Sequence, residues 1–468
     1  MAFLTKAANR GSVPTGPYEI DNSLKMESDN TESMTRTPSS SGNRKTWTVS
    51  FWFKRTELGA AVRLFEAWDG STGTSALFTD ADLFILDLNT ASNYFTSSQV
   101  FRDTSAWYHF VVRVDTTSAT ASERARVYVN GSELVGSWTG GYIGQNTDLT
   151  WNQNVAHYLG VFHTSSNFAN GYYAEVINVD GTSLAPTAFG EFDDDSGIWI
   201  PKQRGGSYGT NGFKLEFKNS SNLGQDTSGN GHTWTLNNIT SIDQATDTPT
   251  NNFCTINPLV DNGFAIFSLT EGGTRGPNTG EGNKSVGTFG VSKGKWYWEG
   301  VTTAASGTNY WKWGITRVDM QQGYSHDPGT GSAWYSAENT FLTQTGVGSS
   351  SPTYDTGITS YTVGDIWSIS LNCDVNPYEI TLRFNNSVPG TAANNTDRSV
   401  GTFASADAVM PYFFLSNIAS DDTWHNFGNP FIATLSGGNT DENGYGDFKY
   451  TPPSGYYALC SKNLAEFG

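Results

Sequence analysis

The chain has 468 residues and a formal net charge of -18, with charged side chains at 15% of positions and aromatic ones at 14%. So many aromatic residues with so few charges exclude a disordered chain and are typical of an all-β protein with many turns. The negative charge supplies no basic surface that could displace counterions, so neither nucleic acid nor an anionic membrane is expected as a partner.

The cysteines and the first residues narrow the class further. Cys254, Cys373 and Cys460 are odd in number and far apart, which predicts buried free thiols instead of a disulfide framework or a zinc site. No apolar run reaches the length of a membrane span, and residues 1–16 lack the apolar segment of a signal peptide. We therefore expect a protein made in a cytoplasm and not inserted into a membrane.

Alternation of apolar and polar residues predicts strands through the first half. In TWTVSFWFKR, residues 46–55, every second residue from Trp47 to Phe53 is apolar and faces one side, which predicts a strand with one buried face. In RARVYVNGSELVGSW, residues 124–138, Asn130-Gly131 predicts a tight hairpin because both residues accept positive φ. Further strands are predicted at 106–115, 155–162, 172–179 and 212–219.

Residues 220–260 carry many turn formers without periodicity, which indicates a seam between two domains. Strands are then predicted at 294–301, 309–316, 365–373, 378–386, 409–417 and 456–461. Many short strands between turns predict an all-β chain of two tandem antiparallel β-sandwiches joined by a turn-rich connector. The predicted boundaries are 1–240 for the first sandwich with its N-terminal arm, 241–261 for the connector and 262–468 for the second sandwich.

Two family resemblances add to this interpretation. The ordered strings WTVSFWFKR, WYHFVVRVD and RVYVNGSEL resemble the laminin-G-like branch of the concanavalin A-like lectin/glucanase superfamily, over about residues 18–240. The strings GKWYWEGV, KWGIT, GDIWSISLNCD, ITLRFNN, MPYFFLS, HNFGNPF and YTPPSGYYAL resemble SPRY domains, over about residues 262–460. Both resemblances imply concanavalin A-like jelly rolls, and the second implies protein recognition without catalysis.

A further resemblance concerns the setting of the chain. SGNGHTWTLNNITSIDQATDTPTNNFCTINPL, residues 228–259, and YYALCSKNL, residues 456–464, are similar to segments in structural proteins of marine tailed phages. This implies a non-catalytic virion protein, made in the host cytoplasm, that serves as a tail fibre or appendage. Its implied partners are other virion proteins, further copies of itself, and a glycan or protein of the host surface. A head-decoration or capsid-fibre protein making only protein–protein contacts is the alternative, and a polysaccharide hydrolase ranks last.

The stretch GQDTSGNGHTWTLNNI, residues 224–239, begins like a calcium loop. An EF-hand loop that starts at Asp226 would need Glu at its twelfth position, where Asn237 stands, and no helical pattern flanks it. We favour turns built by Asx side chains and glycines. A weakly held calcium ion at Asp226 and Asn230 is the alternative, and no other cofactor or metal is expected.

Glucanases of this superfamily would carry two catalytic carboxylates on one face of a strand, and the sequence has no pair at that spacing. Glu175 and Asp180 are five residues apart, which puts them on opposite faces of a regular strand and speaks against an enzyme.

Recognition by aromatic side chains in long loops remains, although most aromatic residues of the chain must be in cores. The candidate loops span 136–154, 321–339 and 443–450. Their candidate ligand-binding residues are Tyr324, Trp334, Tyr335, Tyr445, Trp138 and Tyr142.

Overall fold

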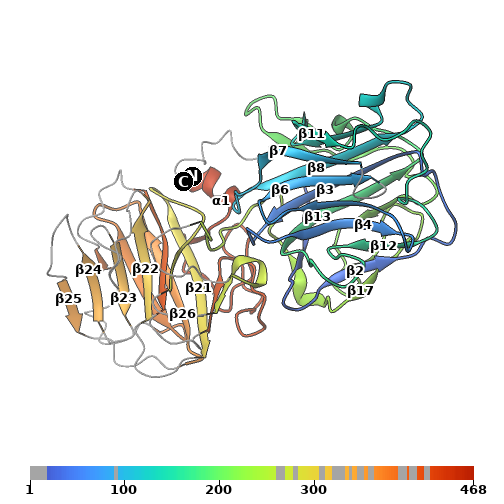
Figure 1. Ribbon diagram of the computed structural model, residues 1–468. Helices are drawn as coiled ribbons and strands as arrows, with labels where there is room; N and C mark the ends of the chain where they lie inside the picture. Colours follow the sequence, from blue (N-terminus) through green and yellow to red (C-terminus); the bar gives the residue numbers. More distant parts are fainter. Residues whose placement is uncertain are drawn as a thin grey trace. The chain divides into compact units, whose positions relative to one another are not determined.

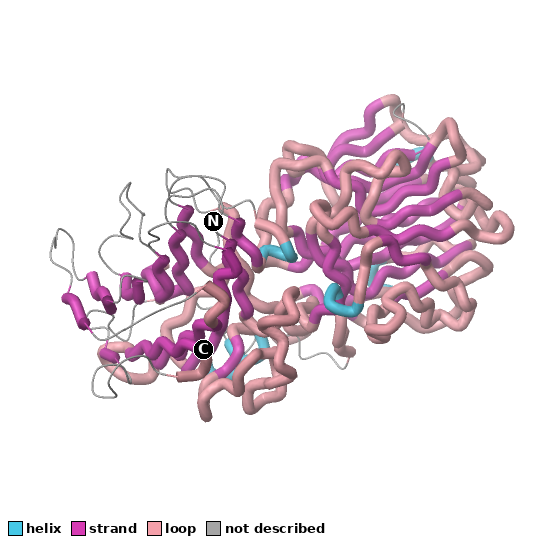
Figure 2. Tube along the Cα trace, turned by 90° about the horizontal axis from the view of Figure 1, so that it is seen from below, coloured by secondary structure: helices cyan, strands magenta, loops and turns pink. Residues whose placement is uncertain are grey.

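The chain forms two compact units that divide between Thr250 and Asn251 (Figure 1). The computed structural model describes residues 18–88, 93–259, 269–277, 283–304, 311–318, 332–336, 340–344, 353–356, 363–387, 398–399, 408–415 and 422–468. We call the described residues up to 250 the first unit and those from 251 onward the second unit. Strands and loops make up nearly all of both, with only short helical segments, as Figure 2 shows.

The first unit contains two eight-stranded antiparallel sheets. Sheet A has the order β10 (Ser132–Glu133), β9 (Ala125–Val129), β8 (Trp107–Asp115), β3 (Thr46–Arg55), β13 (Gly171–Asp180), β1 (Ser23–Met26) and β18 (Gln244–Ala245), with β16 (Phe213–Leu215) also paired to β13. Sheet B has the order β11 (Gly136–Thr139), β7 (Tyr94–Val100), β6 (Leu83–Leu88), β5 (Gly73–Phe78), β4 (Val62–Trp68), β12 (Ala156–Leu159), β2 (Ser33–Arg36) and β17 (Thr235–Asn237). A hairpin of β14 (Gly190–Phe192) and β15 (Trp199–Pro201), and the 3₁₀ turns η1 (Ala121–Glu123), η2 (Pro186–Ala188) and η3 (Ser241–Asp243), complete the unit.

Aromatic side chains from both sheets form the core of the first unit. Phe51 of sheet A stacks on Phe110 at 5.6 Å between ring centroids and meets Phe65 of sheet B edge-on at 6.1 Å. Offset and edge-to-face pairs of this kind add to the free energy gained by burying their area. The predicted inward set of β3, from Trp47 to Phe53 in steps of two, is confirmed, since all four residues belong to this core.

The prediction that only one face of β3 is buried is wrong. Trp52 and Lys54, on the opposite face, are 3% and 0% exposed. Trp52 stacks on His109, whose Nδ1 accepts a hydrogen bond from Trp199 of the β14–β15 hairpin, and Lys54 pairs with Asp247. Segments far along the chain therefore cover the outer face of this strand.

The Asn130-Gly131 hairpin between β9 and β10 is confirmed. Its two turn residues have φ of 47° and 78°, the left-handed conformation of a type I′ turn. A Cβ built on Gly131 would lie 2.3 Å from Cε3 of Trp199, whose indole is fixed by its bond to His109.

Replacing Gly131 by valine is expected to destabilise the first unit by about 3–5 kcal/mol, combining left-handed strain with the overpacking of a fixed ring. Gly141→Val is the matched control, because Gly141 has φ of 79° and nothing within 4 Å of its Cβ position. That variant should cost only the strain, about 1–2 kcal/mol. Chemical denaturation of both variants checks this, and equal losses would contradict the packing argument.

The second unit repeats the two-sheet arrangement. One sheet has the order β19 (Arg275–Pro277), β30 (Asp422–Asn426), β21 (Lys295–Ala304), β26 (Ile366–Asn372), β27 (Glu379–Phe384) and β28 (Arg398–Ser399), with β31 (Tyr457–Ala458) paired to β21. The other has the order β20 (Asn283–Val286), β29 (Val409–Leu415), β22 (Trp311–Arg317), β23 (Ser332–Ser336), β24 (Thr340–Gln344) and β25 (Thr353–Thr356). The 3₁₀ turn η4 (Glu271–Gly273) and the helix α1 (Ser461–Phe467) are its helical segments among the described residues.

Tryptophans dominate the core of the second unit, including Trp296, Trp298, Trp313 and Trp367. The expected buried thiols are confirmed, as all three cysteines are buried and none forms a disulfide bond. In the described parts of the chain, no helix combines the length and apolar character that a membrane crossing requires.

The segment expected as a connector, 241–261, divides between the two units. Residues 241–250 belong to the first unit, where β18 pairs with β1. Residues from 251 belong to the second unit, where Cys254 and Ile256 enter the core. The turn-rich composition of this segment therefore does not correspond to an exposed connector, because parts of it are buried in each of the two units.

Candidate ligand-binding site

Two of the aromatic residues predicted as ligand contacts come together in the structure. Trp138 of β11 is half-buried and packs on Phe95 at 5.7 Å between ring centroids. Tyr142 lies 5.7 Å from the Trp138 ring and is 46% exposed. The pair forms a small aromatic surface beside the edge strand of sheet B, but only Tyr142 is largely open to solvent.

The other predicted contacts are dispersed. Tyr445 belongs to the second unit, where it packs against a core cluster and under the Lys462 ammonium, 5.6 Å from its ring centroid. Trp334 and Tyr335 lie in strand β23 instead of the expected loop, and the side chains of that strand are outside the described part of the structure. Tyr324 also lies outside the described residues.

The 224–239 stretch is a turn held by the carboxylate of Asp226. One of its oxygens accepts hydrogen bonds from the Lys214 and Ser228 amides, and the other from the Ser228 hydroxyl and the His232 amide. Burial raises the pKa of Asp226, but these bonds outweigh it and hold the pKa below its usual value. Asn230 donates to the carbonyls of Gly209 and Gly212. The side chains that sequence suggested for calcium are thus engaged by the protein itself.

Chelation by EDTA is therefore expected to leave the melting temperature of the first unit unchanged, because protein donors already occupy the Asp226 oxygens. Differential scanning calorimetry with and without EDTA checks this. A fall of several degrees that calcium reverses would contradict the assignment of this stretch as a turn.

The strand that carries Glu175 and Asp180 is not regular. A β-bulge between Ala174 and Ile177 interrupts β13, so the premise of regular alternation from Glu175 to Asp180 is wrong. Glu175 instead contacts Lys214 at 2.8 Å. Asp180 accepts hydrogen bonds from the backbone N–H groups of Asn43 and Asn211. The two carboxylates therefore serve separate structural networks.

A pocket of about 390 Å³ opens on the outer face of sheet B, near its β17 edge. We call it the Tyr158 pocket. Its lining combines aromatic rings, hydroxyls and amides, from three stretches of the first unit. The lining residues are Thr31, Ser33, Thr35, Tyr158, Val161, Phe162, Ser165, Phe168, Asn237 and Asn238.

Strand register brings these stretches together. Tyr158 lies directly opposite Thr35, and Asn237 lies opposite Ser33. Because side chains alternate along a strand, these residues face outward while the intervening Met34 enters the core. The polar and aromatic residues of the pocket therefore rest on a rigid sheet.

The loop after β12 forms a second wall and is tied to β4. Glu66 accepts hydrogen bonds from the His163 amide and ring, at 2.8 and 3.2 Å. The Arg63 guanidinium lies 4.4 Å from the centroid of Phe162 and donates to the Ser75 hydroxyl. These contacts fix the Phe162 ring at the side of the pocket.

Three lining residues have left-handed backbone conformations that side chains disfavour. Thr31, Ser165 and Asn238 have φ of 56°, 59° and 58°, and such strain concentrates at functional sites. The side-chain amide nitrogen of Asn238 donates hydrogen bonds to the backbone carbonyl of Asn30 and to the Thr31 hydroxyl. The β2 and β17 sides of the pocket thus hold each other in place.

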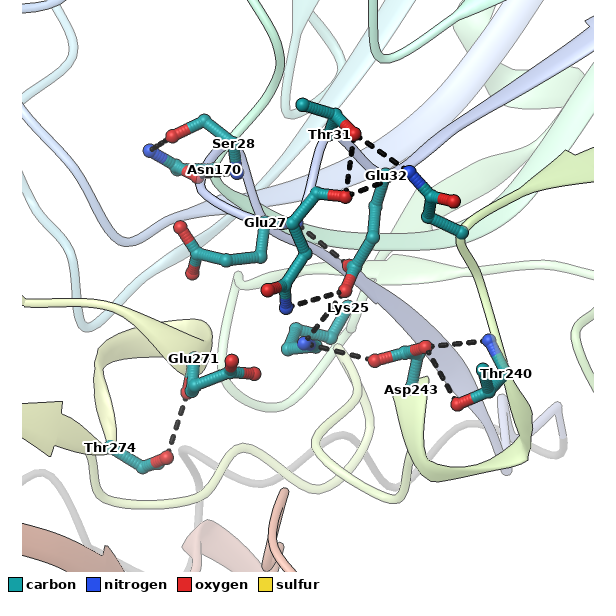
Figure 3. A network of polar contacts seen from close by, with 12 residues as sticks. Lys25, Glu27, Ser28, Thr31, Glu32, Asn170, Thr240, Asp243, Glu271 and Thr274 are labelled. Carbon is teal, nitrogen blue, oxygen red and sulfur yellow. Dashed lines mark hydrogen bonds and ion pairs between the residues drawn. The ribbon is translucent and has the colours of Figure 1, made fainter.

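A buried ionic cluster supports the Thr31 turn from below (Figure 3). Lys25, 1% exposed, contacts Asp243 at 2.9 Å and Glu32 at 3.3 Å. Glu32 also accepts bonds from the Glu27 amide and the Asn30 side chain. Burying these charges is costly unless they are paired, so the cluster specifies one geometry for the turn.

Two hydroxyl groups of the pocket are available to a ligand. The hydroxyls of Tyr158 and Ser165 have no hydrogen-bond partner among the described residues. Burial, with a contribution from Glu66, raises the pKa of Tyr158. Its hydroxyl, like that of any tyrosine at neutral pH, is protonated and can donate a hydrogen bond. None of the lining residues carries a charge. The pocket can therefore form hydrogen bonds and apolar contacts, but no ion pair from its own walls.

Sequence reasoning missed this pocket. The sequence predicts residues 155–162 only as a strand, and it places residues 237–238 in a turn-rich segment, at the end of the strand-like run HTWTLNN. The one available signal was the pair Asn237-Asn238 directly after a short alternating run, and it did not indicate which strand would lie beside it.

Comparisons with known proteins bear on the fold. Residues 29–181, about a third of the chain, match the family model of the concanavalin A-like lectin/glucanases superfamily. No curated protein sequence matches the chain. The predicted fold class, all-β with concanavalin A-like antiparallel sandwiches, is thereby confirmed.

Similar solved structures include a candidate carbohydrate binding protein from Bacteroides ovatus, 14% identical with a TM-score of 0.33, where the match covers 47% of this chain and 59% of that one. Domains LG4-5 of the mouse laminin alpha1 chain are 10% identical with a TM-score of 0.29, covering 88% and 90%. The SPRY domain of human HERC1 is 16% identical with a TM-score of 0.24, covering 37% and 92%.

Proposed function

We propose that this chain is a non-catalytic recognition protein that binds a glycan of a cell surface through its first unit. The observation that carries the proposal is the Tyr158 pocket. Its half-buried aromatic rings lie beside the unpaired hydroxyls of Tyr158 and Ser165 and beside the amide groups of Asn237 and Asn238. Concave sites with apolar walls and a few placed polar groups are the usual form of small-ligand sites. The lectin-like match of residues 29–181, which includes Tyr158, agrees with this proposal.

The proposed setting is a phage virion, with the chain as a tail fibre or appendage that contacts the host. The support is the resemblance of residues 228–259 and 456–464 to phage structural proteins. Other virion proteins and further copies of the chain would be its partners on the particle. Many copies would convert weak individual sites into strong attachment, because each bound site raises the local concentration of the next.

Two alternatives compete with this proposal. A head-decoration or capsid-fibre protein would use the same sandwiches for protein–protein contacts only. A polysaccharide hydrolase ranks last, because Glu175 and Asp180 are held in separate structural networks.

The test uses the purified full chain and cells of the host on which the particle grows. We expect the fluorescently labelled chain to bind these cells, to block adsorption of the particle, and to lose binding after periodate oxidation of surface glycans. An antibody against the chain should label the tail or its appendages. Labelling of the head, with no binding to cells, would replace the proposal with the decoration alternative.

A further inference from the structure

We propose that the Tyr158 pocket binds an uncharged sugar residue and selects against acidic sugars. This inference rests on the proposed glycan recognition and names the ligand class of one site. It follows from the apolar walls, the unpaired polar groups and the absence of charge in the lining.

The apolar part fits one face of a sugar ring. Tyr158, Phe162 and Phe168 are all half-buried, so each ring presents part of its surface to the pocket. Aromatic rings offer a large apolar area together with few rotatable bonds. A pyranose has a face of C–H groups that can lie on such a ring, with its hydroxyls directed around the edge.

The polar part matches hydroxyl groups, which both donate and accept hydrogen bonds. The Tyr158 and Ser165 hydroxyls can do the same. The Asn237 side chain adds two donors and an acceptor, and its one described contact is a long one of 3.5 Å to the Thr35 hydroxyl. A purely apolar ligand would leave these groups without partners, which is unfavourable once water is displaced.

The charge distribution selects against acidic sugars. The lining holds no lysine, arginine or histidine. The Arg63 guanidinium, which covers Phe162, donates to Ser75. Glu66 lies opposite Tyr158 in the β4–β12 register, and the chain carries a net charge of -18. A carboxylate in the pocket would lose its hydration without gaining a counter-charge.

The backbone of the site is set before any ligand arrives. Thr31 and Asn238 keep their left-handed conformations through their mutual hydrogen bond. Phe162 and Ser165 are joined by a backbone hydrogen bond of 2.8 Å within the loop. Such preorganisation reduces the entropy lost on binding.

Saturation-transfer NMR on the full chain tests the inference. The neutral probes are the methyl glycosides of glucose, galactose and N-acetylglucosamine, and the acidic probes are glucuronic acid and N-acetylneuraminic acid. We expect at least one neutral probe to bind more tightly than both acids. Tyr158→Phe, which removes one hydroxyl and keeps the ring, should weaken that binding about 3- to 10-fold. Asn237→Ala should weaken it similarly.

Tyr94→Phe is the matched control, because it removes the hydroxyl of another half-buried tyrosine of the same unit that lies outside the pocket. It should leave binding unchanged. Equal weakening by both tyrosine variants, or preference for an acidic probe, would overturn the inference. Periodate-sensitive binding to cells without any neutral probe bound would overturn it while leaving the proposed function standing. If the chain binds neither a neutral probe nor the cells, both the inference and the proposed function are overturned.

Discussion

Replacing Asp247 by alanine is expected to destabilise the first unit by about 3–5 kcal/mol, because it leaves a buried charge without its counter-charge. Lys54, 0% exposed, contacts an Asp247 carboxylate oxygen at 2.7 Å, and the other oxygen accepts a hydrogen bond from the Trp107 indole at 2.9 Å. The backbone carbonyl of Asp247 also accepts a bond from Ser23. This residue therefore joins the end of the first unit to its first strand and to the outer face of β3.

Calorimetry of the full chain measures the effect as a fall of the first-unit transition by roughly 10 °C. The double variant Lys54→Met, Asp247→Asn is the control, since it removes the buried charge and retains an acceptor for Trp107. It should recover most of the stability. A single Asp247→Ala variant that melts like the parent chain would show that residues 241–250 act as a connector, as sequence first suggested.

Acidification from pH 7 to pH 4.5 is expected to cost the first unit about 4–5 kcal/mol through protonation of its two fully buried histidines in the unfolded chain. Burial lowers the pKa of His109 to about 3 and that of His157 to about 4. The unfolded chain binds these protons near pH 6.5 and the folded chain does not. Stability is therefore full above that pH and falls as the pH drops toward the folded values.

Burial lowers the pKa of His109, and the hydrogen bonds of its ring agree with the neutral form. Its Nδ1 accepts from Trp199 while its Nε2 donates to the Ser50 hydroxyl at 2.8 Å, so a second ring proton would point at the indole N–H.

In the second unit, burial lowers the pKa of His425 to about 3 but raises that of Glu299 to about 7. Between pH 7 and 4.5 the effects of these two groups on stability oppose each other. Glu299 binds a proton at a higher pH in the folded chain than in the unfolded chain, so acidification stabilises the second unit through Glu299.

Denaturation at several pH values, followed separately for the two transitions, checks this account. The first unit should lose stability on acidification while the second changes less. His157→Gln should remove about half of the loss in the first unit. Equal pH dependence of both units would contradict the proton assignments.

Local patterns were sufficient for several central strands but not for what covers them. The alternation in residues 46–55 identified the core face of β3, and Asn130-Gly131 identified its hairpin, because both features depend on neighbouring residues alone. The outer face of β3 could not be predicted, since Trp199 and Asp247 reach it from well over a hundred residues away. The same limit explains the connector, where turn-rich composition concealed two buried acids, Asp243 and Asp247.

The residue types of a recognition site could be predicted from the sequence, but the Tyr158 pocket could not. Aromatic rings beside amides were the chemistry sought, and Trp138 with Tyr142 does form a half-open pair. The pocket that has this chemistry instead joins Thr35, Tyr158 and Asn237 across three strands. Only the register of those strands brings the residues together, and no local spacing encodes that register.

The central claim is that the first unit recognises a surface glycan through the Tyr158 pocket, and competition for particle adsorption tests it most directly. Three proteins are each added to host cells before the particle: the purified parent chain, the double variant Tyr158→Phe, Asn237→Ala, and the control variant Tyr94→Phe. The account predicts that the parent chain and Tyr94→Phe block adsorption equally, while the pocket variant needs at least a tenfold higher concentration. Equal blocking by all three proteins, with each variant folded by calorimetry, would contradict the account.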